Sequence, residues 1–438
     1  MIRNGVKWLA VSVLGVLALA TVLWCASRLW PMPEQLRHGL ALMQAPDPAE
    51  GPSGYALLWM LEFDGMDDAS REAAMAVDAA RWRAHPEPAG GVRKSAEDDH
   101  PRISYPAGRS CSGPTGTCLA EVRREPQRFA QAHAGHQGLH ARVAQLAAFE
   151  QFTHPWDTDV AAIMLPIPAF NGLTDPIAAH ALAHVQGDTA GALKGLCTGI
   201  AAGRRLLSGG DTLIASTLGM AMVELNGGVL GEVLAELPRD AALPAACQAA
   251  LQPMDAAQTS LCRPMRGELQ FGGMALRYSA RAPGAVLALD VARSQARIAS
   301  GYSWACDPAQ QQTLAEDRQI APPPLPTRGF DCVANLVGCG LTEMSGPHYL
   351  TFAERSQDAA AMVRLLAAQQ WLRAQPGTTA EALARLPAAF RSATRAPQAS
   401  ADGHWLQVPR HDTSRGDDGR LLRVPLRLEP APSRQAAR

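Results

Sequence analysis

A long apolar run lies near the amino end of the chain. The nineteen residues from Trp8 to Ala26 carry no charge and include only two hydroxyl side chains, Ser12 and Thr21. As an α-helix this run would be about 28 Å long, close to the hydrocarbon thickness of a bilayer. We therefore predict a transmembrane helix over 8–26 that stays in the mature protein as a signal anchor.

A cleaved secretory signal is the alternative interpretation of the same segment. Arg3 and Lys7 would form its charged region, and Ala18–Ala20 would supply the small residues of a cleavage site. The apolar character continues to Trp24, however, which favours an anchor, and an indole there suits the membrane interface. Two basic residues flank the run on each side, Arg3 and Lys7 before it and Arg28 and Arg37 after it, so the free amino group is what predicts a cytoplasmic amino end.

Beyond the anchor, apolar residues recur every three or four positions, the spacing of amphipathic helices. The most regular stripe runs from Ile214 to Leu237. Glu224 and Glu232 lie within it, which argues against a second membrane span. Two helices separated by Gly187 and Asp188 are expected before it, and others are predicted over 34–43, 55–62, 69–82, 126–152, 241–251, 265–278, 284–301, 349–373 and 380–386.

Near the carboxyl end the pattern changes from helical spacing to an alternation at every second residue. Trp405 and Gln407 alternate with their neighbours, and so do Leu422, Val424, Leu426 and Leu428. The polar stretch 412–419 separates the two runs, so the pattern predicts a β-hairpin. Pro409 and Pro425 are expected to confine both strands to edge positions.

These patterns predict a mainly α protein. Its transmembrane helix is followed by an irregular helical bundle or a short α-solenoid-like array, with a small C-terminal β-hairpin. The expected divisions are a cytoplasmic stub and anchor over 1–30, a helical and loop region over 31–120, a central helical domain over 121–306, a Pro-rich linker over 307–330, and a helix plus hairpin over 331–438.

The cysteines indicate an oxidising compartment. Eight remain when Cys25 in the apolar run is set aside, and two pairs share a spacing of seven residues. We predict disulfides between Cys111 and Cys118 and between Cys332 and Cys339, because short loops with nearby glycines close easily. The spacing leaves the connectivity of the other four open (Cys197, Cys247, Cys262 and Cys306).

The composition excludes some partners. The formal net charge is −1, so no global field attracts nucleic acid. Alanine supplies much of the apolar fraction, and alanine favours packed helices over a β-sandwich. The membrane is the expected partner, and an envelope protein is a possible second one. No cofactor is expected.

Three histidines at helical spacing are the strongest candidate for metal chemistry. His133, His136 and His140 would project from one face of the helix predicted over 126–152. No carboxylate lies inside the triplet to orient the rings, and Gly135 and Gly138 weaken the helix. A solvated polar stripe is therefore the favoured interpretation, and no metal site is predicted.

Other candidates have equally simple structural interpretations. His180 and His184 have the spacing of a metal-ligand pair but lack the Glu that would follow in a zincin, and they are expected to hydrogen-bond at a helix interface. Glu268 could be an acid or base in a groove, but an ion pair with a nearby arginine is preferred. His154, Asp157 and Asp159 lie close together in the sequence and could bind a cation, but a turn capped by an aspartate explains them equally well. The arginines that could pair with Glu268 are Arg263, Arg266 and Arg277.

The usual catalytic motifs are absent from the sequence. No glycine is followed by lysine, so there is no P-loop, and no Gly-x-Ser-x-Gly, Cys-x-x-Cys or His-Glu-x-x-His occurs. No catalytic residue is therefore assigned. A convergent site built without a motif stays open.

Several short stretches carry a resemblance to single-pass membrane-anchored helical proteins of bacteria. They are Arg204–Leu207, Asp211–Ile214, Arg266–Glu268 and Arg364–Gly377. Trp371 and Thr378-Thr379 depart from the tyrosine and Tyr-Pro expected there. The resemblance covers about half of the chain and implies no named activity.

The sequence thus favours a non-enzymatic scaffold or interaction protein. It would be anchored in a bacterial inner membrane, with the bulk of the chain in the periplasm. The alternative is an envelope hydrolase that uses a histidine-based metal site.

Overall fold

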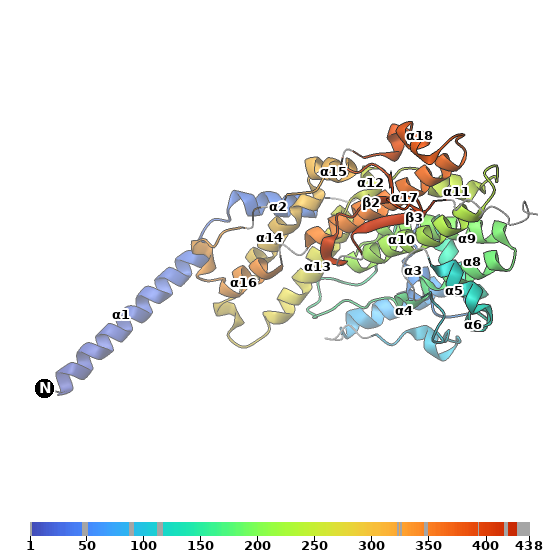
Figure 1. The fold of residues 1–438 in the computed structure, drawn as a ribbon. Coiled ribbons are helices and arrows are strands. Elements are labelled where there is room, and N and C mark those ends of the chain that lie inside the picture. Colours follow the sequence, from blue (N-terminus) through green and yellow to red (C-terminus); the bar gives the residue numbers. More distant parts are fainter. Residues whose placement is uncertain are drawn as a thin grey trace, which may run out of the picture.

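The computed structural model describes residues 2–45, 51–86, 92–111, 117–321, 324, 326–345, 349–392, 394–415 and 419–426. Helix α1 (Ile2–Leu29) projects as a single rod from a helical body (Figure 1). Its apolar stretch Val6–Leu29 is long enough to cross a membrane, and its most apolar part is not buried by the rest of the protein. The predicted apolar helix is therefore present.

The body is mainly helical, as predicted. The elements of its first half are α2 (Glu34–Gln44), α3 (Tyr55–Trp59), α4 (Asp68–Ala84), α5 (Cys118–Arg124), α6 (Pro126–Ala132), α7 (Gln137–Gln145), α8 (Asp175–Val185), α9 (Thr189–Gly209) and α10 (Leu213–Glu236). Those of its second half are α11 (Ala245–Ala250), α12 (Ala256–Thr259), α13 (Cys262–Ser279), α14 (Val291–Tyr302), α15 (Pro308–Ala315), α16 (Leu336–Ser345), α17 (Leu350–Arg373) and α18 (Thr379–Ala384).

Helix α10 lies at the centre of the body, against both α9 and α17. Gly203 on α9 and Gly219 on α10 face each other, and a Cβ on Gly219 would lie 2.4 Å from the backbone nitrogen of Leu207. Because α10 is covered on most sides, the single predicted stripe does not describe its buried surface. Ile214 and Leu225, both in that stripe, are exposed.

A small antiparallel sheet packs against α10 and α17. Its strands are β1 (Gln398–Ala399), β2 (Trp405–Pro409) and β3 (Leu421–Pro425), in the order β1-β2-β3. The predicted hairpin is β2–β3, but β2 is central rather than an edge strand. Pro409 is tolerated because β1 pairs only with Leu406 and Gln407 and ends before it. Leu428 lies outside the described residues.

Two helical predictions need correction. The helix expected over 126–152 is divided into α6 and α7, because Gly135 between them has a φ of +83°. The helix expected from Gly284 begins only at Val291, after the capping side chain of Asp290. The stretch 307–330, expected as a linker, contains α15 and the buried Asp317; Pro322 and Pro323 lie outside the described residues.

Four disulfides join the cysteines of the body. The two predicted short pairs, Cys111–Cys118 and Cys332–Cys339, are confirmed. The pairs that the spacing left open are Cys197–Cys247, between α9 and α11, and Cys262–Cys306, between α13 and the short 3-10 helix 303–306 that follows α14. Cys25 on α1 is exposed and free.

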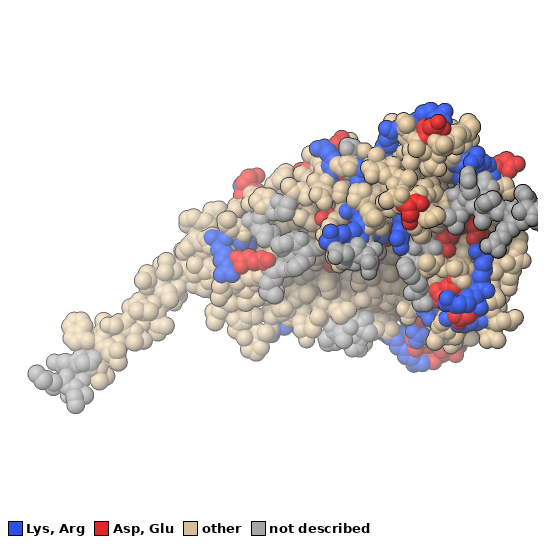
Figure 2. Space-filling view, viewed as in Figure 1, with Lys and Arg blue, Asp and Glu red and all other residues tan. Residues whose placement is uncertain are grey.

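The carboxyl end of α1 is fastened to the body. The indole of Trp24 donates to the carbonyl of Leu287 at 2.8 Å, and Ser27 donates to the carbonyl of Phe330 at 2.7 Å. Around this junction the body exposes an apolar collar, and Figure 2 shows almost no charged side chains on the lower face of the body beside α1. The collar consists of Val286, Leu287, Val333, Leu336, Val337 and Leu341.

A buried carboxylate on α10 caps α5. Glu232 accepts hydrogen bonds from the backbone nitrogens of Cys118, at 3.2 Å, and Leu119, at 2.8 Å. Burial raises the pKa of Glu232 to about 7, although these two hydrogen bonds oppose the shift. The folded protein therefore holds a proton here that the unfolded chain releases near its ordinary pKa of 4.5.

We expect the stability contributed by Glu232 to fall as the pH rises from about 4.5 to about 7. The folded state binds more protons across this window, so the free energy of unfolding decreases by up to roughly 3 kcal/mol. The Glu232→Gln variant cannot titrate, so its stability relative to the wild type should rise over the same window. Urea unfolding at several pH values measures this difference, and a constant difference from pH 4.5 to 8 would contradict the assignment.

Candidate functional site

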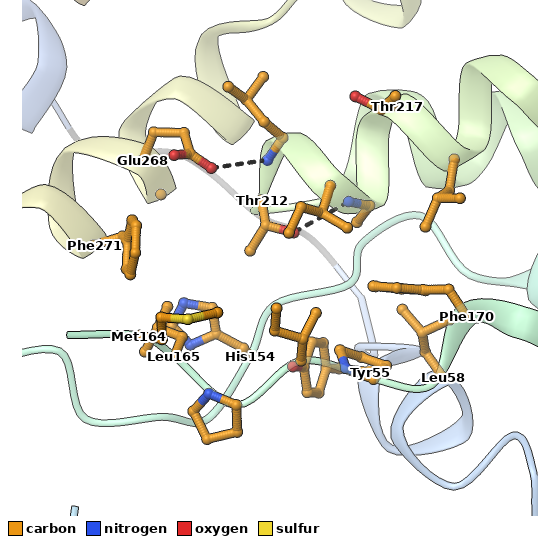
Figure 3. Close-up of a pocket in the computed structure, with 18 of the residues that line it drawn as sticks. Tyr55, Leu58, His154, Met164, Leu165, Phe170, Thr212, Thr217, Glu268 and Phe271 are labelled. Carbon is orange, nitrogen blue, oxygen red and sulfur yellow. Dashed lines mark hydrogen bonds between the residues drawn. The ribbon is translucent and has the colours of Figure 1, made fainter. Parts of the chain in front are cut away.

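A large cavity of about 790 Å³ opens beside the amino end of α10 (Figure 3). Its walls come from α3, the loop 154–170, the first turns of α10, the middle of α13 and the start of α17. Most of its lining is apolar. The apolar side chains include Leu58, Met164, Leu165, Ile167, Phe170, Leu213, Ile214, Leu218, Phe271 and Phe352.

The rim of the cavity is apolar as well. Met164 and Ile167 on the loop and Ile214 on α10 all line the cavity, and 38–44 % of each residue's surface is exposed. Exposed large apolar residues gathered around an opening are typical of sites that receive an apolar partner. The volume lies within the range of about 300–1,000 Å³ common for small-molecule sites.

Close helix packing brings Glu268 to this cavity. A Cβ on Gly267 would lie only 1.7 Å from the carbonyl oxygen of Asp211, so glycine alone lets α13 approach the segment before α10 this closely. Glu268 then meets the amino end of α10, where its Oε1 lies 3.4 Å from the backbone nitrogen of Leu213. Burial raises the pKa of Glu268, which favours its neutral form.

Glu268 makes this helix-capping contact, and two of the three arginines predicted to pair with it bond elsewhere. Arg266 instead donates to the carbonyl of Leu42 at 3.1 Å, and Arg277 donates to the carbonyl of Thr158. For these two arginines the prediction was wrong, because spacing along the chain does not show which helix crosses above the carboxylate.

Other polar groups sit on the cavity wall. Thr217 has a buried hydroxyl that forms no hydrogen bond within the described part of the chain, and the Nδ1 of His154 is likewise unpartnered there. The backbone nitrogen of His154 donates to Asp211 at 2.6 Å, and its Nε2 lies 3.8 Å from the same oxygen. Burial raises the pKa of Asp211, and His154 partly offsets this.

The predicted cluster of His154, Asp157 and Asp159 is not assembled. His154 faces Asp211, whereas Asp157 accepts a hydrogen bond from the backbone of Asp159 at 2.9 Å. The side chain of Asp159 is fully exposed. The turn interpretation of these aspartates is therefore confirmed.

The three clustered histidines lie elsewhere, in a buried group around Asp175. His133 directly follows α6 and His136 directly precedes α7, and each is only 6 % exposed; His140 on α7 is half-buried. The solvated stripe predicted for them is wrong, because the chain turns at Gly135 and directs their rings inward. Asp175, at the start of α8, was missed.

One carboxylate oxygen of Asp175 lies close to a nitrogen of each of the three histidine rings. Its Oδ2 lies 3.3 Å from Nδ1 of His133, 2.9 Å from Nδ1 of His136 and 2.9 Å from Nε2 of His140. The Nε of Arg109 lies 3.1 Å from the other oxygen, Oδ1. Together the three nitrogens and Oδ2 form a set of potential metal ligands.

His180 and His184 on α8, considered above as a possible ligand pair, have different surroundings. His184 lies 3.0 Å from Glu236 and 3.0 Å from the hydroxyl of Thr189, so it bonds at a helix interface as expected. His180 lies beside the histidine group, with its ring centroid 6.4 Å from that of His140. Burial, together with the nearby His140 and His133, lowers the pKa of His180 to about 4.

Comparison with protein families, with curated proteins and with solved structures finds no significant match to this chain. The functional inference therefore depends on the geometry of the cavity, of the histidine group and of the membrane-facing end.

Proposed function

We propose that the protein is a membrane-anchored, extracytoplasmic, non-enzymatic binding protein whose cavity receives an acyl chain. The observation that carries this proposal is the cavity of about 790 Å³ with an apolar lining and an apolar rim. Each methylene removed from water contributes about 0.8 kcal/mol, so a long chain gains substantial binding energy in such a cavity.

The polar groups of the cavity suit a weakly polar or acidic ligand head. Burial raises the pKa of the Glu268 carboxyl on the cavity wall, and the hydroxyl of Thr217 is available there. A compact strongly cationic or anionic ligand would find few charged partners here. An acyl chain with a carboxyl or ester head satisfies both parts of the lining.

The junction with α1 supports a position at the membrane surface. The apolar collar surrounds the end of an apolar helix long enough to span a bilayer. Both indoles meet the body at this junction: Trp24 donates to the carbonyl of Leu287, and Trp30 contacts the ring of Phe330 with centroids 5.2 Å apart. Indole rings and exposed aliphatic side chains settle together at the headgroup boundary.

The disulfides support placement of the body outside the cytoplasm. All eight cysteines of the body are paired, as is usual in oxidising compartments. With the amino end inside, this topology corresponds to an anchor in a bacterial inner membrane and a periplasmic body. An envelope protein partner could meet the body there.

The alternative function, a metal-dependent hydrolase, receives less support. The histidine group around Asp175 does not contribute to the cavity lining. Substrate binding and histidine chemistry would therefore have to occur at separate places. Binding without chemistry requires only the cavity.

A cavity-filling variant tests the proposal. The full chain in lipid nanodiscs is incubated with a photoactivatable fatty acid or, separately, a photoactivatable phospholipid, and the labelled residues are mapped by mass spectrometry. We expect labelling of the cavity lining by at least one probe. Ile214→Trp should weaken it by about 15-fold if two methylenes are displaced.

Leu225→Trp is the matched control. It lies on the same helix and is similarly exposed, at 48 % against 44 % for Ile214, but it does not line the cavity. The control should label like the wild type. If only one probe labels the cavity, that probe identifies whether the acyl chain comes from a fatty acid or from a phospholipid. Equal labelling of Ile214→Trp and Leu225→Trp, or labelling only outside the cavity, would overturn the proposal.

A further inference from the structure

We propose that His133, His136, His140 and Asp175 form a structural zinc site. Zinc in proteins is usually bound by four ligands in a tetrahedron, and imidazole nitrogens and carboxylate oxygens are among its ordinary ligands. The four ligand atoms lie within 4.8 Å of one another. Small ring movements would therefore bring each of them to about 2 Å from a common ion.

Hydrogen bonds on the outer side of the rings fix where the protons lie. Nε2 of His133 is 2.9 Å from the carbonyl oxygen of Arg109, and Nε2 of His136 is 3.1 Å from the carbonyl oxygen of Ser104. A carbonyl can only accept, so both Nε2 atoms carry hydrogen. In a neutral ring the Nδ1 atom is then a bare lone pair.

These lone pairs point at an acceptor. Nδ1 of His133 and Nδ1 of His136 both face Oδ2 of Asp175, which is itself an acceptor when ionised. For both Nδ1 atoms to donate to Oδ2, each ring would need a second hydrogen, beside Arg109, which already pairs with Asp175. One divalent ion binds both lone pairs, His140 and Oδ2 at once. Carbonyl partners on the outer nitrogens are also what metal-ligating histidines use to hold their orientation.

The site is built from three parts of the chain. The turn between α6 and α7 supplies His133 and His136, α7 supplies His140, and α8 supplies Asp175. The segment 104–109 contacts the site through two backbone carbonyls, which accept from His133 and His136, and through the side chain of Arg109, which pairs with Asp175. A zinc ion here would fasten these parts together.

The role follows from the number of ligands. Four protein donors complete a tetrahedron and leave no position for substrate, which is the arrangement of structural zinc sites. The other potential cluster, Asp331 with Cys332 and Cys339, is excluded because its two sulfurs are bonded to each other. The zinc site is independent of acyl-chain binding, since none of its four ligands lines that cavity.

Metal binding by the purified full chain in detergent tests the site. After treatment with a chelator the protein is titrated with Zn²⁺ alone, and bound zinc is measured by elemental analysis and by competition with a chromophoric chelator. We expect one zinc per chain, a higher midpoint of thermal unfolding with zinc, and tetrahedral d–d absorption when Co²⁺ replaces it. His140→Ala should lose more than about 100-fold in affinity, beyond the 10–100-fold typical of lost outer partners.

His184→Ala is the matched control, because His184 is on the adjacent helix α8 and bonds Glu236 instead of Asp175. It should bind zinc like the wild type. Absence of stoichiometric zinc in the wild-type chain would overturn the proposal without reference to any variant. Unchanged zinc affinity in a folded His140→Ala protein would overturn it equally.

Discussion

Replacing Arg395 with methionine is expected to destabilise the protein by about 3–5 kcal/mol, because it leaves two buried carboxylates without their main partner. Arg395 donates through Nε to Asp317 at 2.9 Å and through Nη1 to Asp358 at 2.5 Å. Asp358 is fully buried and Asp317 is 1 % exposed. Urea unfolding of the full chain, followed by circular dichroism, measures the loss.

The network explains why the loss is large. Burial alone would raise the pKa of Asp317, but His411, Arg395 and Arg364 hold it well below its ordinary value. Without Arg395 one of these favourable partners disappears while the cost of burial remains. The same residue also joins three distant segments, since Asp317 follows α15, Asp358 is on α17, and Arg395 precedes β1.

Two variants separate this effect from a general effect of losing an arginine. Arg318→Met removes an arginine whose pair with Glu316 is largely exposed, and it should cost no more than about 1 kcal/mol. Adding Asp358→Asn to Arg395→Met removes one stranded carboxylate, whose other ion partner Arg410 keeps its pair with Glu224, and should recover part of the stability. If the double variant were less stable than the single one, uncompensated charge on Asp358 would not be the cause.

The local periodicity of the sequence predicted much of the fold. The run 8–26 predicted α1, and the stripe from Ile214 predicted the bounds of α10 within one residue. The prediction succeeded where the deciding forces are local: a helix was expected over 380–386, and α18 begins there behind the capping box of Thr378 and Glu381. It failed where tertiary packing decides which residues are buried. Helix α10 is covered on most sides, so it has no single buried face.

The candidate sites could be predicted only in part. His133, His136 and His140 were visible as a triplet, but Asp175 lies 35 residues after His140, and only the fold brings it to them. Gly135 signals the turn, because its φ of +83° ends the helical conformation between the histidines. The cavity could not be found from the sequence, because its walls come from segments as distant as Tyr55 and Phe352.

Removing the long disulfide between Cys197 and Cys247 is the second change expected to have a large effect. The bond closes a loop of 50 residues and joins α9 to α11 within the main hydrophobic core. In the chain-entropy model a loop of this length contributes about 4 kcal/mol, by limiting the conformations of the unfolded chain. The Cys197→Ala/Cys247→Ala variant should lose about this amount in urea unfolding.

The short disulfide between Cys332 and Cys339 provides the comparison. Its loop spans only seven residues, so Cys332→Ala/Cys339→Ala should cost about 2 kcal/mol in the same model. The alanine substitutions leave no unpaired polar group in either pair, and both pairs are buried, which makes loop length the main difference. Equal losses for the two variants would show that strain or packing, and not the entropy of the unfolded chain, controls what these bonds contribute. A larger loss for the long loop would mean that the cross-link from α9 to α11 is a principal source of stability in the body that carries the cavity.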